Sequence, residues 1–348
     1  MARGSAGQVV AALETGGMRF HDNQLDYYGK RVAAAASDNT VYIWDVTDNQ
    51  QKPAGQVKGH EGPVWKVAWA HPKYGSLLAT CGYDMKIIVW KEVPAYSGSW
   101  QIAYMDTSHG ASVNDVQFCQ FEDGLRLAAA SSDGTVSVLS YGPDHQWRRS
   151  AFQAHAGGAQ TVSWASGGAS TLRLVTGGCD HGVSIWRSAD GEAWSQESPP
   201  LPPVHTDWVR AVSWRPAGAG SSVFASGSWD GTVAIWGQEA EGQPWRQISK
   251  LTFTEKVEGL AWSLTGSLLA VSYGSGDVTL FREAYNGGYE EIGKVAEQGF
   301  VEVANSVPIG GGPGLAGPSD AAAGAAAPPS LSAELANQQQ AVLDSFGM

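Results

Sequence analysis

The sequence has few of the features that indicate a disulfide-bonded, zinc-binding or nucleic-acid-binding protein. It contains three cysteines, Cys81, Cys119 and Cys179, which are far apart and form no CxxC pair. An odd number of widely spaced cysteines argues against a disulfide framework and a structural zinc site. Basic residues (22) are outnumbered by acidic ones (34), and no basic block occurs. Because phosphate binding needs clustered Lys and Arg, direct contact with nucleic acid is not expected.

Long apolar runs are also missing. No segment approaches the length that crosses a bilayer, and the N-terminus has no secretory apolar stretch. Together with the cysteine usage, this predicts a reducing compartment, the cytosol or the nucleus. Any association with a membrane would then come through partner proteins.

Glycine and tryptophan, by contrast, are abundant, with 44 and 15 residues in a chain of 348. Tight turns between short strands use glycine, and large sheet faces that pack on one another use tryptophan. The hydrophobic fraction of 43% excludes a disordered chain. The length suits one large all-β domain with a tail.

An internal repeat determines the predicted fold. A short β-branched run is closed by an apolar residue at successive intervals of 46, 49, 47, 50 and 45 residues. These closing residues are Trp44, Trp90, Leu139, Trp186, Trp236 and Phe281. Six positions earlier, five repeats carry aspartate in a tight-turn context and the sixth carries serine: Asp38, Asp84, Asp133, Asp180, Asp230 and Ser275. Each repeat therefore contains a turn followed by a strand.

Two further markers recur with the same period. A histidine precedes the aspartate by 24 or 25 residues in four repeats: His60, His109, His155 and His205. An aromatic residue follows the closing residue by eight to ten positions in five repeats and is expected to open an outer strand: Trp100, Trp147, Trp194, Trp245 and Tyr289. The first and sixth repeats lack the histidine, and the third closes with leucine, so these repeats must rely more on packing.

This order of markers resembles the WD-repeat family, whose repeats form four-stranded propeller blades. The resemblance implies an all-β, six-bladed WD-repeat β-propeller over residues 18–303. It also implies a hydrogen-bonded network at each turn, because a buried aspartate must be paired or hydrogen-bonded. The residues expected in these networks are His60, Asp84, Trp90, His109, Asp133, His155, Asp180, Trp186, His205, Ser226, Asp230 and Trp236.

Longer segments are more specific than the repeat. Residues 25–31 (LDYYGKR), 59–84 (GHEGPVWKVAWAHPKYGSLLATCGYD) and 205–214 (HTDWVRAVSW) resemble the small WD-repeat subunit of the COPII outer coat. The resemblance implies a non-catalytic scaffold that pairs with an α-solenoid partner to build the vesicle cage in transport from the endoplasmic reticulum to the Golgi. It places the protein on the cytosolic side of the endoplasmic reticulum and of COPII vesicles. The same family also serves in the Y-shaped scaffold of the nuclear pore, at the nuclear envelope, and in a complex that regulates amino-acid signalling.

The family resemblance further implies an open ring that a partner completes with a seventh blade. The sixth repeat accounts for its own strands, ending at 289–295, so the apolar run 9–13 is surplus to it. Uncovered strand edges are a liability, and a partner can cover them by adding strands. The candidate edge residues are Val9, Val10 and Leu13, in an N-terminal edge strand within 1–17, with Leu280 and Phe281 in the sixth repeat. The alternative is ordinary closure of the ring by residues 8–13.

Other functions are less well supported. Serine, histidine and aspartate recur at the same offsets in several repeats, which is typical of a structural network and not of one hydrolase site, and there is no GxSxG elbow. The glycine-rich run 310–317 contains Pro313 and lies in an Ala/Gly/Pro tract, so we predict a linker and no cofactor or metal site. A second hypothesis is a closed propeller that reads short peptides, for which Trp208 and Trp229 are loop aromatics suited to contact a partner.

The C-terminal segment, 304–348, has a different composition. Residues 304–329 are rich in Gly, Ala and Pro and are expected to be disordered. Residues 330–346 place Leu331, Leu335, Val342 and Phe346 near one helical face. This pattern fits either a short docking helix or a transient one.

Overall fold

The computed structural model describes residues 17–47, 52–166, 171–216, 222–274, 276–285, 287–296 and 299–302, without the side chains of 121, 296 and 299–302. The N-terminal run 9–13, Ser275 and the segment 304–348 lie outside the described residues. Strands dominate the described part, which also contains the short 3₁₀ turns η2 (Pro72–Tyr74) and η3 (Phe121–Asp123).

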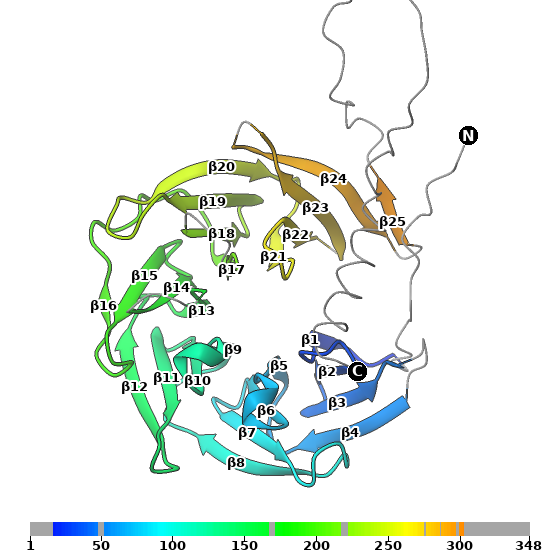
Figure 1. Ribbon diagram of the computed structural model, residues 1–348. Coiled ribbons are helices and arrows are strands. Elements are labelled where there is room, and N and C mark those ends of the chain that lie inside the picture. The colour runs from blue at the N-terminus through cyan, green and yellow to red at the C-terminus, as the bar shows by residue number, and fades with distance from the viewer. Residues whose placement is uncertain are drawn as a thin grey trace, which may run out of the picture. The chain divides into compact units, whose positions relative to one another are not determined.

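The strands form six antiparallel sheets, which are the blades of a propeller (Figure 1). The strands of blades one and two are β1 (Phe20–Leu25), β2 (Arg31–Ala36), β3 (Thr40–Asp45), β4 (Lys52–Lys58), β5 (Val64–Trp69), β6 (Leu77–Gly82), β7 (Ile87–Glu92) and β8 (Trp100–Asp106). Those of blades three and four are β9 (Val113–Phe118), β10 (Arg126–Ser131), β11 (Thr135–Tyr141), β12 (Trp147–Gln153), β13 (Ala159–Trp164), β14 (Leu172–Gly178), β15 (Val183–Ser188) and β16 (Ser195–Gln196). Those of blades five and six are β17 (Val209–Trp214), β18 (Ser222–Ser228), β19 (Thr232–Gln238), β20 (Arg246–Thr252), β21 (Val257–Trp262), β22 (Leu268–Tyr273), β23 (Asp277–Glu283), β24 (Tyr289–Ala296) and β25 (Gly299–Glu302).

Each sequence repeat gives one blade, so the prediction of an all-β propeller with six blades is confirmed. The aspartate turns join the second and third strands, and the closing residues lie in the third strands. Trp100, Trp147 and Tyr289 open outer strands, whereas Trp194 and Trp245 stand one residue before theirs. Blade six also contains a fifth strand, β25, paired antiparallel with β24, which the repeat did not predict.

The core lies between neighbouring blades. In the described residues, buried aliphatic and aromatic side chains form five large clusters, which join blades one and two, two and three, three and four, four and five, and five and six. A sixth, smaller cluster also joins blades two and three. Tight packing of such faces supplies most of the stability of a domain. In the described part of the chain, no corresponding cluster joins blade six to blade one.

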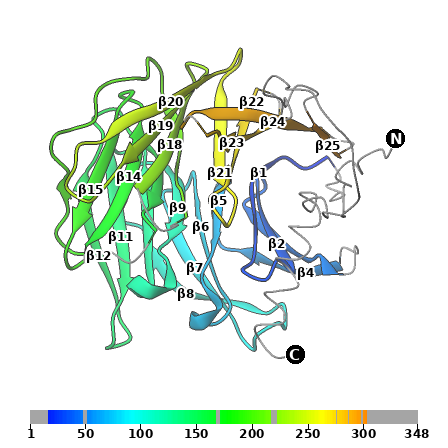
Figure 2. The same cartoon turned by 45° about the horizontal axis from the view of Figure 1, so that its top comes forward.

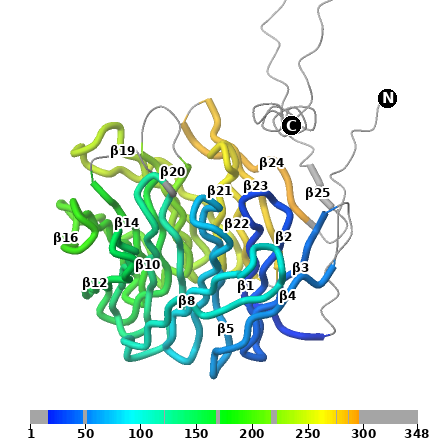
Figure 3. Tube along the Cα trace, turned by 60° about the horizontal axis from the view of Figure 1, so that its bottom comes forward, coloured from blue at the N-terminus to red at the C-terminus, as the bar shows by residue number. Residues whose placement is uncertain are grey.

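Strand contacts follow the same order. The inner strands meet their neighbours in the series β1, β5, β9, β13, β17 and β21, and Figure 3 shows the blades following one another along the chain. Among the described residues, no contact of comparable extent joins β21 to β1. Figures 1 and 2 show no described strand between these two blades. Blades one and six are therefore the two ends of the series.

Candidate functional site

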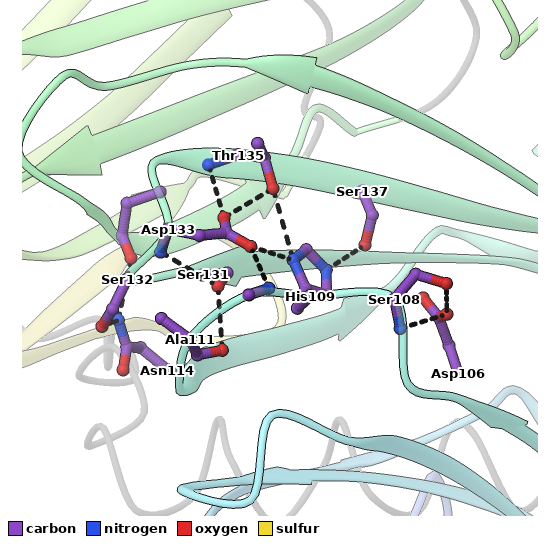
Figure 4. A network of polar contacts seen from close by, with 12 residues as sticks. Asp106, Ser108, His109, Ala111, Asn114, Ser131, Ser132, Asp133, Thr135 and Ser137 are labelled. Atoms are coloured by element: carbon purple, nitrogen blue, oxygen red, sulfur yellow. Dashed lines mark hydrogen bonds and ion pairs between the residues drawn. The ribbon is translucent and has the colours of Figure 1, made fainter.

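Blade three shows the turn network at close range (Figure 4). His109 lies in the loop that follows β8, the outer strand of blade two. Its ring lies beside the aspartate turn between β10 and β11. Its Nδ1 lies 3.0 Å from Asp133 Oδ2, and its Nε2 lies 2.8 Å from Ser137 Oγ. Asp133 also accepts from the backbone N–H and the hydroxyl of Thr135, at 2.8 and 2.6 Å. The aspartate thus fixes the turn, and the histidine fixes the aspartate.

The other three histidines make the same arrangement with one difference. His60, His155 and His205 place Nδ1 near the turn aspartate, at 2.9, 2.8 and 3.4 Å. Their Nε2 atoms contact a hydroxyl on the second strand, to which the indole N–H of the closing tryptophan also donates. These hydroxyls and indoles belong to Thr80 and Trp90, Thr176 and Trp186, and Ser226 and Trp236.

In blade three the hydroxyl moves to the third strand. Leu139 has no indole N–H to satisfy, and the second strand β10 offers alanines at 128–130 in place of a hydroxyl. Ser137, on β11, takes over the contact with His109 Nε2. The loss of the closing tryptophan and the loss of the second-strand hydroxyl therefore go together, because a buried hydroxyl on the second strand would lack the indole N–H as a partner.

Charges in the networks favour the folded state. Burial opposes ionisation of Asp180, but the hydrogen bond from His155 and those from two backbone N–H groups lower its pKa to about 2. Burial lowers the pKa values of His109 and His205 more than their aspartates raise them. Neutral imidazoles can donate from Nδ1 to the carboxylate and accept at Nε2 from the hydroxyl.

The histidines, aspartates and hydroxyls of these networks have a structural role in the turns. Thr80 and Ser226 are fully buried, so their hydroxyls are not presented to a substrate. The same kind of contact recurs in four blades. Such repetition is expected of a network that stabilises an equivalent turn in each blade. In the described residues, no three His, Cys, Asp or Glu side chains come together as a metal site. No helix in that part is long and apolar enough to span a bilayer.

The outward faces of blades one and six are the candidate binding site. In blade six, β22 alternates between half-buried and buried residues, whereas β6 in blade two is buried throughout. Side chains alternate between faces along a strand, so the buried residues face blade five and the half-buried ones face away from it. Leu268, Ala270 and Leu280 belong to the second set, and Ala270 pairs directly with Leu280.

Phe281 does not share this face. It is 7% exposed and packs in the cluster between blades five and six. Its register partner Leu269 lies in the same cluster. Leu280 therefore remains a candidate edge residue, whereas Phe281 is a core residue. Val9, Val10 and Leu13 lie outside the described residues.

Blade one presents an aromatic face away from blade two. Tyr42 and Trp44 on β3 are half-buried and stack with ring centroids 5.8 Å apart. Phe20 on β1 meets both rings edge-on at 6.0 Å. Asp38 accepts from the Tyr42 hydroxyl at 2.7 Å. The other face of β3, which carries Ile43, packs on blade two.

Comparison with known proteins identifies the family. The family model "WD domain, G-beta repeat" matches residues 51–91 and 201–237. The chain is 40% identical over 289 residues to "Protein SEC13 homolog" of Drosophila melanogaster, covering 78% of this chain and 80% of that protein. It is 37% identical over 311 residues to "Protein transport protein sec13" of Emericella nidulans, covering 84% of this chain and 100% of that protein. The chain belongs to the SEC13 family.

A third relative has a similar degree of identity. "Protein transport protein SEC13" of Yarrowia lipolytica is 41% identical over 293 residues, which covers 80% of this chain and 96% of that protein. The family resemblance predicted from residues 25–31, 59–84 and 205–214 is thereby confirmed.

Most tryptophans of this SEC13 family member bridge blades. Trp164 and Trp214 are buried between blades, and Trp65 donates from Nε1 to Ser112 at the next blade, at 2.8 Å. Trp208 and Trp229 differ, because they stack at 5.0 Å with an interplanar angle of 16° and Trp208 is 39% exposed. Lys256 Nζ lies 4.1 Å from the centre of the Trp229 ring.

The cysteines are free, as expected from their spacing. Cys81 and Cys119 are buried small residues. Burial raises the pKa of both thiols, which keeps them protonated and unreactive. Cys179 is partly exposed, because it stands directly before the Asp180 turn at the blade surface.

Polar links that the repeat did not predict also join the inner strands. Asp22 and Gln24 on β1 accept from the backbone N–H groups of Val67 and Trp69 on β5, at 3.1 and 2.6 Å. Blade three repeats the contact toward blade four, where Asp115 and Gln117 accept from the N–H groups of residues 162 and 164. The Asp-x-Gln pattern in two inner strands was the signal that could have found them.

Proposed function

We propose that this chain is a non-catalytic scaffold subunit of the COPII outer coat. It pairs with an α-solenoid partner, and the pairs build the vesicle cage in transport from the endoplasmic reticulum to the Golgi. Membership in a family whose members are named protein transport proteins supports the process. The observation that carries the mechanism is that the core clusters join only successive blades, from blade one to blade six, which leaves one face of blade one and one face of blade six without a neighbour among the described residues.

The proposed mechanism is sheet sharing. The ring is open between blades six and one, and the partner inserts strands there as a seventh blade. Its side chains would cover Tyr42 and Trp44 on one side and Leu268 and Leu280 on the other. Burial of such apolar faces contributes about 25 cal/mol per Å², and added strands satisfy exposed strand edges.

The flanking segments have proposed roles as well. We propose that residues 1–17 form an N-terminal edge strand beside blade one, that the propeller spans 18–303, and that 304–348 form a disordered Gly/Ala/Pro-rich tail in which 330–346 can form a short helix, either docked or transient. The chain resides on the cytosolic side of the endoplasmic reticulum and of COPII vesicles. It also serves in the nuclear pore scaffold at the nuclear envelope, with partners that use the same opening.

The test is affinity purification of the tagged chain from its own cells, followed by mass spectrometry of stoichiometric partners. The scaffold role predicts an α-solenoid protein near one-to-one stoichiometry that carries its own short strand segment. Trp44→Asp should lose this partner, whereas Trp208→Ala, on another surface, should retain it. A monomer without any stoichiometric partner would refute the proposal.

A second candidate is a closed propeller that reads short peptides. The stacked pair Trp208 and Trp229 favours it, because exposed aromatics in loops are common binding anchors. This candidate predicts a stable monomer whose peptide binding is lost in Trp208→Ala and unaffected in Trp44→Asp. The same two variants therefore distinguish the two functions.

A further inference from the structure

Three blades carry an arginine at one equivalent position. Arg31, Arg126 and Arg173 each stand directly before the residue that pairs across the sheet with the closing residue of the blade. This position lies at the outer margin of the core, where one blade meets the next. An arginine there must find acceptors, because a guanidinium carries five donors and is costly to bury unpaired.

Two of the three arginines are satisfied within the fold. Arg31 donates from Nε to Asp45, its cross-strand partner, at 2.8 Å, and from a terminal nitrogen to Glu92 of blade two at 2.9 Å. Arg173 donates to Glu197 at 2.8 Å and to Gln238 of blade five at 3.0 Å. Glu92 and Gln238 occupy the same place, two residues after the closing tryptophan of the following blade.

Around Arg126, serines occupy the two positions that Asp45 and Glu92 occupy around Arg31. Its cross-strand partner is Ser140, where Arg31 has an aspartate. Two residues after the closing tryptophan of blade four stands Ser188, whose Oγ is engaged by Asp190 and by the Gly191 N–H, at 2.9 and 2.8 Å. Arg126 Nε is buried without a hydrogen-bond partner, and in the described part of the chain its guanidinium has no ion pair within 4.0 Å.

The arginine lines a groove between blades three and four with a volume of about 960 Å³. Two other arginines in the lining are neutralised, since Arg148 pairs with Asp144 and Arg149 pairs with Asp106, at 2.7 and 2.9 Å. The acidic residues of the lining are Glu122, Asp123, Asp190 and Glu192. Of these, Asp190 is committed to capping its own turn, through hydrogen bonds from Ser188 and two backbone N–H groups.

We propose that this groove is a second binding site, for a peptide segment of a partner protein that carries an acidic side chain between basic ones. The acidic side chain takes the place that Asp45 and Glu92 fill around Arg31, and it accepts from the Arg126 guanidinium. The flanking basic residues meet Glu122 and Glu192, which are exposed at the groove. A free carboxylate ion would leave most of the volume unfilled, so an extended peptide fits better.

The location makes the site independent of the opening. Three blades precede the groove and three follow it, so it lies on the opposite side of the ring from blades one and six (Figure 1). A partner bound at the opening therefore leaves the groove accessible, and one propeller can join two partners.

The test uses short random peptides displayed on phage and selected against the full chain. The proposal predicts selected peptides with one Asp or Glu flanked by Lys or Arg. The affinity of such a peptide, measured by calorimetry, should fall by about tenfold to a hundredfold when Arg126→Gln is introduced or when the peptide's acid is replaced by its amide. Arg187→Gln, which removes an exposed arginine outside the groove, should leave the affinity unchanged.

A converse variant separates ligand binding from a structural role of Arg126. Ser140→Asp recreates the cross-strand pair of Arg31 and Asp45, so it should raise the melting temperature while it abolishes peptide binding. Equal melting temperatures of wild type and Arg126→Gln would show that loss of binding is not loss of fold. Selected peptides without a carboxylate, peptides that bind Arg126→Gln as tightly as wild type, or a selection without any binder would each overturn the proposal.

Discussion

At the scale of single residues, the turn networks depend on one buried hydroxyl. In blade five, Ser226 Oγ accepts from Trp236 Nε1 at 3.0 Å and contacts His205 Nε2 at 2.8 Å. The resemblance to the WD-repeat family implied that His205, Asp230, Ser226 and Trp236 meet. It could not predict the role of Ser137 in blade three, because that role follows from the absence of both an indole and a second-strand hydroxyl.

Ser226→Ala should lower the free energy of unfolding by about 1–3 kcal/mol, because it leaves the His205 ring and the Trp236 indole without their shared partner in the core. Urea unfolding monitored by tryptophan fluorescence measures this difference. Ser195→Ala, at an exposed position on β16, is the control and should be neutral. Equal stability of the two variants would show that the network does not support the blade.

The pH dependence of stability follows from the same networks. The pKa values of His109 and His205 lie below the ordinary value of 6.5 in the folded chain because the rings are buried. The unfolded chain therefore binds protons first, and this part of the stability is lost as the pH falls below 6.5. The pKa of Asp180, lowered to about 2 from 3.8, adds a further loss between those values. Urea midpoints measured from pH 7.5 downward should decrease, with a smaller decrease near pH 6 in His205→Gln; midpoints that rise on acidification would contradict this.

At the scale of elements, blade six shows what the repeat could and could not predict. Periodicity gave the turn before β23 and the outer strand β24, because both follow from spacing. It did not give β25, because this strand follows the last repeat and has no counterpart in the other blades. Periodicity also could not predict that Phe281 is in the core and Leu280 is on the outward face. That difference depends on which face of the blade-six sheet packs against blade five.

The two neighbours on β23 should respond in opposite ways. Phe281→Ala should destabilise the chain by about 3–5 kcal/mol, because it opens a cavity in the cluster between blades five and six. Leu280→Asp should change the unfolding free energy little but abolish copurification of the α-solenoid partner. Thermal unfolding and pull-down of the two variants measure both effects. Loss of stability in Leu280→Asp without loss of partner would place this residue in the core.

At the scale of the whole molecule, the order of blades explains why a ring of similar repeats has two unlike ends. Every interior blade packs on two neighbours, so its middle strands are buried on both faces, as in β6 and β18. Blades one and six have one neighbour each among the described residues, and their outward faces carry Tyr42, Trp44 and Leu280 half-buried. A scaffold that is completed by its partner needs such ends, and a closed receptor does not.

The most direct measurement is hydrogen–deuterium exchange of the chain alone and in complex with its α-solenoid partner. Completion of the ring by inserted strands predicts increased protection of backbone amides in β1–β3 of blade one and β21–β23 of blade six. The amides of blades three and four should exchange equally in both states. Unchanged protection in blades one and six upon binding would show that the partner does not enter the ring, and would contradict an open propeller completed from outside.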